Sequence, residues 1–185
     1  MHLGVGGFHR AHQAWCTDRA LAASGGDWRI RAASLRSTDT VDELMLQDGL
    51  FSVLERDAAG TRARVVGSLA GGIAAARDPQ ALERALADPA LRIVTLTVTE
   101  KAYAAGQGGE PSAVVRCLVE ALARRRRDGV EPFTALCCDN LAANGEALRR
   151  VTLHAAERED ASLARWIEAN MAFPSSMVDR IVPAP

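Results

Sequence analysis

The chain has 185 residues, with 22 basic and 23 acidic side chains and a formal net charge of −1 at pH 7. This length suits one α/β domain with a core of its own and is too short for two domains of ordinary size. Because the charges balance, no overall basic field attracts nucleic acid or an anionic membrane, and we expect a small-molecule partner.

Residues 1–12, MHLGVGGFHRAH, predict a short strand around Leu3 that runs through a glycine turn into a helix. Gly4 and Gly6 allow a tight turn with no side chain in the way, and the following helix offers unpaired N–H groups and the positive end of its dipole. This arrangement is typical of a site for the pyrophosphate of a dinucleotide. The third glycine of a G-x-G-x-x-G pattern would fall at His9, so a strand, turn and helix without a nucleotide remain an open alternative.

Apolar residues at helical spacing extend this first helix to Ser24, where two glycines end it. The segments that follow are a strand, a helix, the two strands of a hairpin, a helix and a strand, over residues 28–35, 39–46, 51–55, 62–68, 79–86 and 91–98. Ser-Thr-Asp at 37–39 is a capping signal for the second helix, and residues 56–60 connect the hairpin. The last strand is continuously apolar, as in a parallel sheet covered on both faces.

The rest of the chain reads as a glycine-rich loop, an amphipathic helix and a buried strand, over residues 105–111, 112–127 and 132–138. After residues 139–145 come a long helix to about Glu159 and a final helix over residues 163–170. The arginine run at 124–127 is interpreted as a solvated helix end, because cations there favour the helix dipole. The order of elements predicts an α/β fold: a Rossmann-type doubly wound, mostly parallel sheet with an extra β-hairpin, forming one domain over residues 1–185.

In open α/β sheets, ligands bind at the edge formed by the C-terminal ends of the strands. Residues 99–101 and 139–144 each follow a predicted strand, so we expect them to enclose one pocket together with the glycine turn.

The four cysteines are Cys16, Cys117, Cys137 and Cys138, and their spacing matches no zinc site, so no metal is expected. Adjacent Cys137 and Cys138 end an apolar run and read as small buried hydrophobes in a reducing cytoplasm. With no signal peptide and no apolar span long enough for a bilayer, we expect a cytoplasmic protein with no membrane partner.

Five stretches stand out when they are taken together. They are HLGVGGFHRAH at 2–12, TVTEK at 97–101, CDNL at 138–141 with Asn144-Gly145, WI at 166–167 with Asn170, and FP at 173–174 with SMVDRI at 176–181. In this order and at this spacing they resemble the mannitol dehydrogenase family, which comprises polyol-specific long-chain dehydrogenases together with fructuronate and tagaturonate reductases.

The resemblance implies an oxidoreductase that moves hydride, without zinc, between a nicotinamide cofactor and a polyol, its ketose or a sugar acid. The family's catalytic lysine, in a Lys-x-x-x-x-Asn-x-x-His helix motif, belongs to a C-terminal domain expected after Pro185. The chain therefore resembles the cofactor-binding part, which we expect to be inactive alone, and Lys101, its only lysine, is not that base. The family usually carries a longer segment where this chain has residues 103–112.

Two residues are candidates for catalysis by this resemblance. Asn140 would donate to the alcohol oxygen and hold the developing alkoxide, since an amide orients oxygen without competing for the proton. From the residues alone, an Asx turn that caps the next helix is an equal alternative for Asn140, although Asn144 is the better capping candidate. Asp179 would lie near the substrate and bind polyol hydroxyls or tune the lysine, and pairing with Arg180 is its alternative.

The choice of cofactor depends on the end of the second strand, where a carboxylate binds ribose hydroxyls or an arginine accepts the 2′-phosphate of NADP. Asp39 favours NAD, and Arg36 keeps NADP as the alternative. The expected cofactor-binding residues are Gly4, Val5, Gly6, Gly7, Phe8, Arg10, Arg36, Asp39, Thr99, Glu100 and Lys101. His9, in the position of the missing glycine, is expected to set the distance between helix and strand, and His154 is expected at the surface.

Two other functions are compatible with parts of this sequence. A non-catalytic nucleotide-binding or interaction domain would share the glycine turn. The presence of the lysine motif after Pro185 would distinguish an enzyme from such a domain. A methyltransferase is disfavoured because it leaves Asn140 and the Val-Asp-Arg-Ile segment without a role. The identity of the polyol or sugar acid and the oligomeric state cannot be predicted from these residues.

Overall fold

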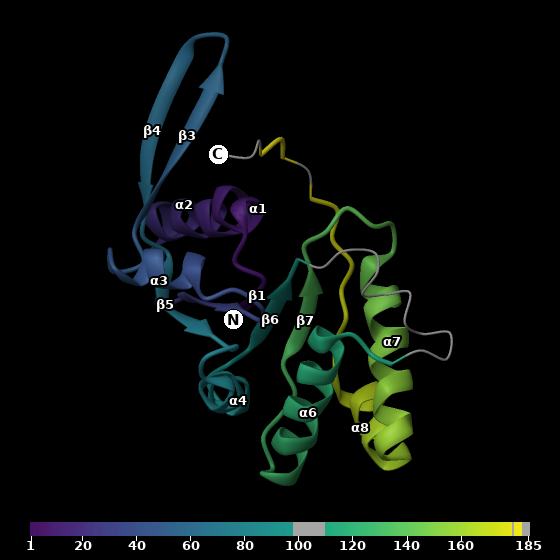
Figure 1. The fold of residues 1–185 in the computed structure, drawn as a ribbon. Helices are drawn as coiled ribbons and strands as arrows, with labels where there is room; N and C mark the ends of the chain where they lie inside the picture. The colour runs from purple at the N-terminus through teal and green to yellow at the C-terminus, as the bar shows by residue number, and fades with distance from the viewer. Residues whose placement is uncertain (98–109, 179, 183–185) are drawn as a thin grey trace. The chain divides into compact units, whose positions relative to one another are not determined.

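The structure is a computed structural model that describes residues 1–97, 110–178 and 180–182 (Figure 1). Contacts divide the chain into two compact units. The N-terminal unit comprises residues 2–79 and the segment from Arg180, and the C-terminal unit comprises residues 80–179 with Met1. Each unit contains parallel strands and buried apolar side chains of its own.

The N-terminal unit contains three parallel strands, their helical connections and a hairpin. In chain order its elements are β1 (His2–Leu3), α1 (Gly7–His9), the π-helical segment η1 (Arg10–Ala14), α2 (Trp15–Ser24), β2 (Ile30–Ser34), α3 (Asp39–Met45), β3 (Phe51–Asp57), β4 (Gly60–Val66) and β5 (Leu69–Ala74). Strand β2 pairs in parallel with β1 on one side and with β5 on the other. The half-unit β5-β2-β1 has the strand order of one mononucleotide-binding half of a Rossmann fold.

The predicted hairpin is present and is longer than expected. Its strands β3 and β4 pair from Phe51–Val66 to Asp57–Gly60, so only Ala58 and Ala59 form the turn. The hairpin extends well beyond the three parallel strands of its unit (Figure 1). Only its base is buried, where Phe51, Val53 and Val66 join the core formed with Ile30, Ala32, Val41 and Leu44.

Strand β5 was not predicted, because its sequence Leu-Ala-Gly-Gly-Ile-Ala reads as a turn and glycine usually weakens a strand. The structure gives the reason for the glycine: a Cβ on Gly72 would lie 2.8 Å from Cγ1 of Val41 and 3.3 Å from Cε of Met45. Glycine at this position thus lets helix α3 pack closely against β5.

The first helix ends at Ser24 as predicted, but its middle turn is π-helical. Two carbonyls of this π segment are bound by side chains from elsewhere in the unit. Ser68 Oγ donates to the carbonyl of Ala14 at 2.8 Å, and Arg180 Nη1 donates to that of Ala11 at 2.7 Å. Segments of this kind are frequent at functional sites, and this one directly follows the glycine turn.

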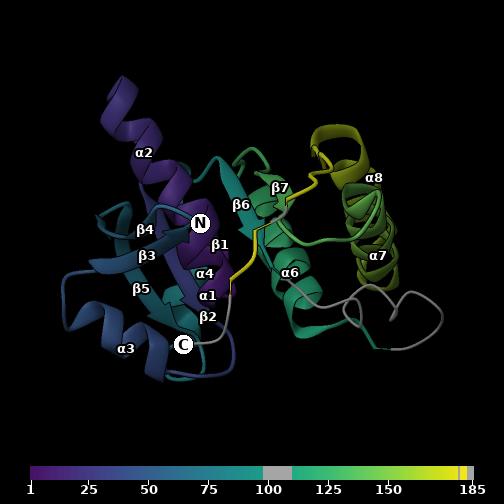
Figure 2. The same ribbon diagram turned by 90° about the horizontal axis from the view of Figure 1, so that it is seen from above.

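The C-terminal unit contains two parallel strands and the helices around them. Its elements are α4 (Pro79–Ala87), which begins at the boundary, β6 (Ile93–Leu96), α6 (Ala113–Arg127), β7 (Thr134–Cys137), α7 (Asn144–Glu159) and α8 (Ala161–Asn170). Helices α7 and α8 lie side by side in both views (Figures 1 and 2). Helix α8 begins two residues earlier than predicted because the Asp160 side chain caps it, accepting from Ser162 N at 2.7 Å.

The arginine run at the end of α6 was predicted to be solvated, and this is wrong for Arg125. Its guanidinium is buried and donates to the carbonyls of Leu86, Asp88, Leu91 and Glu131 at 2.7–3.3 Å. A planar guanidinium presents several donors in fixed directions, which suits such a set of carbonyls. Its neighbours Arg124, Arg126 and Arg127 keep the predicted role and form exposed ion pairs.

We expect Arg125→Met to lower the free energy of unfolding by about 3 kcal/mol, because the buried carbonyls lose their charged donor and water cannot replace it. Urea denaturation of the two proteins measures this difference. Arg127→Met is the matched control, since the Arg127 side chain is 71% exposed on the same helix. Equal losses in the two variants would contradict a special role for Arg125.

Candidate functional site

The glycine turn after β1 has the backbone geometry that the sequence predicts. Gly4 has φ of 107°, a value that favours glycine, and its N–H donates to the carbonyl of Ala33 at 2.9 Å. Gly6 N donates back to the carbonyl of Gly4 at 2.8 Å. Gly6 and Gly7 are exposed, whereas Val5 between the first two glycines is buried in the core.

Gly6 provides a test of whether this turn fits a phosphate group. Its φ of −103° suits any residue, and a Cβ on it would come no closer than 4.0 Å to another atom, the carbonyl oxygen of Gly4. Neither backbone conformation nor packing within the protein therefore requires glycine at Gly6. A side chain there would occupy the open space in front of the helix N-terminus, where a pyrophosphate would approach the backbone.

The start of the first helix carries charge and donors suited to an anion. The first turn of α1 contains no acidic residue, and its early N–H groups have no partner within the helix. Arg10 lies one turn further, with Nε 3.4 Å from the Gly6 carbonyl, so its positive charge is held beside the turn. Phe8 stacks on His12, with ring centroids 5.1 Å apart.

Beneath the turn, His2 of β1 stacks on His9 of α1. Their ring centroids are 3.6 Å apart, the rings are within 8° of parallel, and both side chains are buried. His2 Nε2 lies 3.0 Å from the Gly4 carbonyl, and His9 Nδ1 lies 2.9 Å from Oε1 of Gln13. His9 thus lies between helix and strand, in agreement with the prediction that it sets their distance, while its partner His2 was missed.

Burial keeps both imidazoles neutral. It lowers the pKa of His9 to about 4, although the hydrogen bond from His9 Nδ1 to Gln13 Oε1 acts in the opposite direction, and the charge of Arg10 lowers the pKa further. Burial, followed by the charge that His9 would carry, also holds the pKa of His2 well below its ordinary value. Two neutral flat rings can stack at this distance, whereas two imidazolium ions would repel each other.

Arg36 and Asp39 lie at the same edge of the N-terminal unit as the glycine turn. Strands β1 and β2 run in parallel with Leu3 opposite Ala33, so the residues after both strands meet at one edge. Both side chains are exposed. The capping signal at 37–39 acts through Ser37, whose Oγ accepts from Asp39 N at 3.2 Å, while Thr38 forms no capping bond to the helix backbone.

In the C-terminal unit, Asn140 follows strand β7 and its side chain is exposed. The neighbouring Cys138 N donates to the carbonyl of Leu96 at 2.7 Å, which joins the ends of β6 and β7. Within the described parts of the chain, no hydrogen bond is found for the Asn140 amide, and the residue at the N-cap of α7 is Ala143. The amide therefore does not act as the cap of α7.

Asn144 is also not a helix cap, although the sequence favoured it for that role. It is the first residue of α7, fully buried, and its amide pairs with the backbone of Ser176: Ser176 N donates to Oδ1 at 3.0 Å and Nδ2 donates to the Ser176 carbonyl at 2.8 Å. Nδ2 also contacts the carbonyl and Oδ1 of Asp139 at 3.2 and 3.1 Å. The side-chain amide of Asn144 thus donates to and accepts from one backbone residue, as a paired residue of a neighbouring β-strand would.

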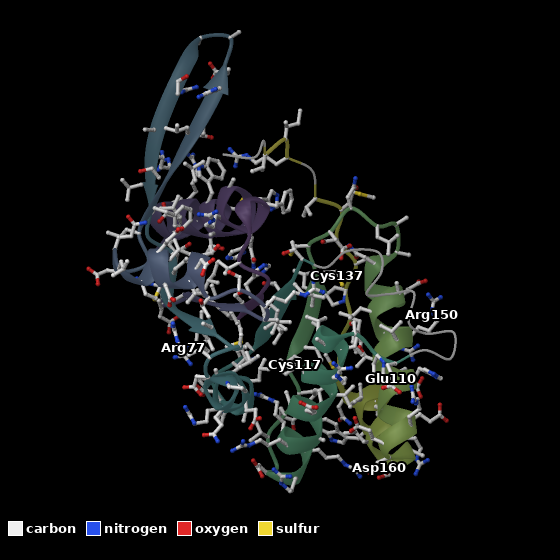
Figure 3. The ribbon with its side chains drawn as sticks, viewed as in Figure 1. Arg77, Glu110, Cys117, Cys137, Arg150 and Asp160 are labelled. Carbon is white, nitrogen blue, oxygen red and sulfur yellow. The ribbon has the colours of Figure 1, made fainter. Side chains whose placement is uncertain are left out.

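Gly145 allows the segment around Ser176 to approach so closely. A Cβ on Gly145 would lie 2.3 Å from the carbonyl oxygen of Phe173, and Gly145 N donates to Ser175 Oγ at 3.1 Å. Ser176 Oγ donates to the carbonyl of Cys137 at the end of β7, where Figure 3 labels Cys137. The resemblance stretches at 138–145 and 173–178 are therefore in direct contact.

Arg180, from the Val-Asp-Arg-Ile segment, binds within the N-terminal unit. Besides the Ala11 carbonyl, it pairs with Glu55 of the hairpin at 3.0 Å and lies 4.4 Å from the centre of the Trp15 ring. Sequence reasoning missed this site, since no local pattern links Glu55 to Arg180. Thr99, Glu100, Lys101 and Asp179, which the sequence placed at the site, lie outside the described residues.

No group of three or more His, Cys, Asp or Glu side chains is placed to hold a metal ion in the ranges that the structure describes. The described helices include none that is both long and apolar enough to cross a lipid bilayer. All four cysteines are free, and Cys137 and Cys138 are buried as predicted. His154 is exposed as predicted.

A glycine turn between a parallel strand and a helix, with an acidic residue after the second strand, defines a Rossmann-type dinucleotide-binding fold. The family described as "Mannitol dehydrogenase Rossmann domain" matches residues 1–185. The chain belongs to this family, which confirms the resemblance, the Rossmann-type fold class and the mostly parallel sheet with its additional hairpin.

Individual relatives agree with this assignment. The chain is 43% identical over 204 residues to mannitol 2-dehydrogenase of Cereibacter sphaeroides, covering 100% of this chain and 43% of that protein. It is 36% identical to D-mannonate oxidoreductase of Escherichia coli and 38% identical to polyol:NADP oxidoreductase of Gluconobacter oxydans, covering 100% and 99% of this chain and 42% of each relative.

Among solved structures, the chain matches the Pseudomonas fluorescens mannitol 2-dehydrogenase ternary complex with NAD and D-mannitol, with a TM-score of 0.89 and 40% identity. The match covers 97% of this chain and 41% of that one. The chain thus spans less than half the length of the relatives it matches. The alignment of 204 residues also exceeds the 185 residues of the chain, so the Cereibacter enzyme has residues without a counterpart here.

We expect the stability of the protein to fall as the pH decreases from about 6.5 to about 4. The ordinary pKa of histidine is 6.5, and that of folded His9 is about 4, so the unfolded chain binds the proton first and the equilibrium shifts towards it. The contribution of neutral His9 to the free energy of unfolding is fully present above about pH 6.5. His9 alone would account for a loss of the order of 3 kcal/mol by pH 4.

Urea denaturation at several pH values measures this slope. His9→Phe keeps a flat ring for the stack on His2 and should flatten the profile, whereas the same profile in His154→Gln should match that of the unchanged protein. A slope that is identical in His9→Phe would refute the assignment.

Proposed function

We propose that the protein is a nicotinamide-dependent oxidoreductase of which this chain forms the cofactor-binding part. Its substrates would be a polyol and the corresponding ketose, or a sugar acid, as in the mannitol and mannonate enzymes that it resembles. The observation that carries the proposal is the open space in front of Gly6, which neither packing nor backbone conformation requires and which we propose a pyrophosphate occupies.

The residues of the N-terminal unit have distinct proposed roles in binding. Gly6 would leave room for the pyrophosphate, and the N–H groups of Gly7 and Phe8 would face it, with Arg10 supplying positive charge beside it. Gly4 and Val5 would maintain the turn. Asp39 would accept hydrogen bonds from the adenosine ribose, and its charge opposes a 2′-phosphate, which supports NAD rather than NADP.

The relatives support both cofactors. The Pseudomonas fluorescens structure is a complex with NAD, and the Gluconobacter oxydans relative is a polyol:NADP oxidoreductase. Arg36 is exposed beside Asp39 and is the group that would favour NADP in this chain. We propose NAD as the preferred cofactor because Asp39 begins helix α3 at the position where a carboxylate binds the ribose.

The nicotinamide ring accepts or donates hydride when the cofactor is bound. This chain's contribution to that chemistry is proposed to come from Asn140, whose exposed amide would hold the alcohol oxygen and stabilise a developing alkoxide. Asp179 is proposed to bind substrate hydroxyls, and Thr99, Glu100 and Lys101 to line the cofactor. The base that removes the hydroxyl proton is expected outside this chain, in a C-terminal catalytic domain of the full-length protein.

The alternative, a non-catalytic nucleotide-binding or interaction domain, has less support. The relatives reported above carry names of oxidoreductases, and the chain keeps Asn140 exposed rather than using it as a cap. We propose a cytoplasmic enzyme, in keeping with four free cysteines.

We expect Gly6→Ala to weaken NADH binding by at least about tenfold, because a methyl group would enter the space proposed for the pyrophosphate. Folding should be unaffected, since the nearest atom to the added Cβ is the carbonyl oxygen of Gly4 at 4.0 Å. NADH fluorescence titration of the full-length protein measures binding, with Gly71→Ala as control, because Gly71 also has open space around it. Unchanged affinity in Gly6→Ala would argue against a pyrophosphate at this turn.

We expect Asn140→Ala to reduce kcat of the full-length enzyme by about a hundredfold or more, the usual effect of removing one donor to an oxyanion. Binding of NADH should stay the same, because the amide is proposed to act on the substrate oxygen. Steady-state oxidation of mannitol and arabinitol and reduction of fructose and fructuronate provide the assay. A variant that loses NADH affinity instead would assign Asn140 to the cofactor and not to catalysis.

A further inference from the structure

An ion pair between Arg77 and Asp42 lies beside the proposed ribose-binding residues. Arg77 Nη1 and Nη2 donate to the two carboxylate oxygens of Asp42 at 2.8 and 2.6 Å, which is a bidentate arrangement. Asp42 is on the first turn of α3, one turn after Asp39, and Arg77 follows strand β5. Figure 3 labels Arg77, and sequence analysis assigned neither residue a role.

Strand register places this pair at the edge where the cofactor is proposed to bind. Strands β2 and β5 are parallel, with Ser34 opposite Ala74, and Ala75 N donates to the Ser34 carbonyl at 2.9 Å. Arg36 and Arg77 thus follow neighbouring strands at their C-terminal ends, within one unit. Arg77 is held by a carboxylate, whereas Arg36 is exposed.

The pair has little value as a structural contact. The side chains of Arg77 and Asp42 are 59% and 42% exposed, and exposed ion pairs contribute little to stability. The hydrogen bonds from Arg77 lower the pKa of the Asp42 carboxyl, so this carboxylate remains charged at neutral pH. The main consequence of the pair is therefore electrostatic: it neutralises and orients an arginine that would otherwise add positive charge to this edge.

An unpaired arginine at this edge is the group that recognises the 2′-phosphate of NADP, through a planar fork of donors. We propose that Asp42 determines coenzyme choice: its carboxylate accepts hydrogen bonds from both terminal nitrogens of Arg77 and so prevents Arg77 from binding a 2′-phosphate. Asp42 is thus a specificity-determining residue that acts through Arg77, in addition to the direct repulsion expected from Asp39. This inference rests on the proposed function, because it concerns the same cofactor site.

The test compares NADH and NADPH binding to the full-length protein by fluorescence titration. In Asp42→Asn the charge that holds Arg77 is removed with almost no change of volume, and NADPH affinity should rise about tenfold relative to NADH affinity, as for one new charge-assisted hydrogen bond. In the double variant Asp42→Asn with Arg77→Met, the gain should disappear, because the arginine that would bind the phosphate is absent.

Asp57→Asn is a matched control, since Asp57 pairs with Arg62 at 2.7 Å on the hairpin and its loss changes the net charge by the same amount. Thermal unfolding verifies that each variant is folded. The inference would be overturned if the gain in NADPH affinity were no larger in Asp42→Asn than in Asp57→Asn, or if it persisted in the double variant that lacks Arg77. In either case, binding of NADH would leave the proposed function intact. Absence of binding of either dinucleotide to the unchanged protein would overturn the proposed function and this inference with it.

Discussion

The stack of His2 on His9 is the contact on which the N-terminal unit depends. A Rossmann turn usually has a third glycine so that the helix can lie close to the strand. This chain has histidine instead, and the helix keeps its place because one flat ring lies on another at 3.6 Å between centroids. The stack also anchors the turn itself, since His2 Nε2 contacts the carbonyl of Gly4, whose φ of 107° directs the chain towards Gly6.

In the C-terminal unit, a buried amide holds two segments together, as the stacked imidazoles do in the N-terminal unit. The end of strand β7 lies beside an extended segment from near the end of the chain, and the Asn144 amide both donates to and accepts from the backbone of that segment. Buried polar groups that are fully hydrogen bonded specify one arrangement more sharply than apolar contacts do. In the N-terminal unit the stacked imidazoles are buried and neutral, whereas the charged residues Arg36 and Asp39 are exposed.

The sequence predicted the elements well where one periodicity dominated. Helix 113–127 was found because its apolar residues recur at helical spacing, and the strands around residues 93–96 and 134–137 were found because each is a continuous apolar run. Strand β5 was missed because its two glycines serve the packing of α3, a requirement that involves Val41 and Met45 far away in sequence. The site shows the same division. Glycine positions and Asp39 follow a local motif, whereas Ser176 opposite Asn144 and Glu55 opposite Arg180 are contacts over long sequence distances that no local rule contains.

Several arginines form contacts that a lysine would form poorly. Arg125 binds carbonyls of three separate segments, and Arg180 combines a carbonyl, a carboxylate and an aromatic face. Each task needs donors that point in fixed directions from a plane, which an ammonium group lacks. The same geometry makes the partner of Arg77 matter in the proposed coenzyme site, because Asp42 already accepts from both terminal nitrogens of this guanidinium. The proposed preference for NAD thus depends on the carboxylate that binds Arg77 as well as on Asp39.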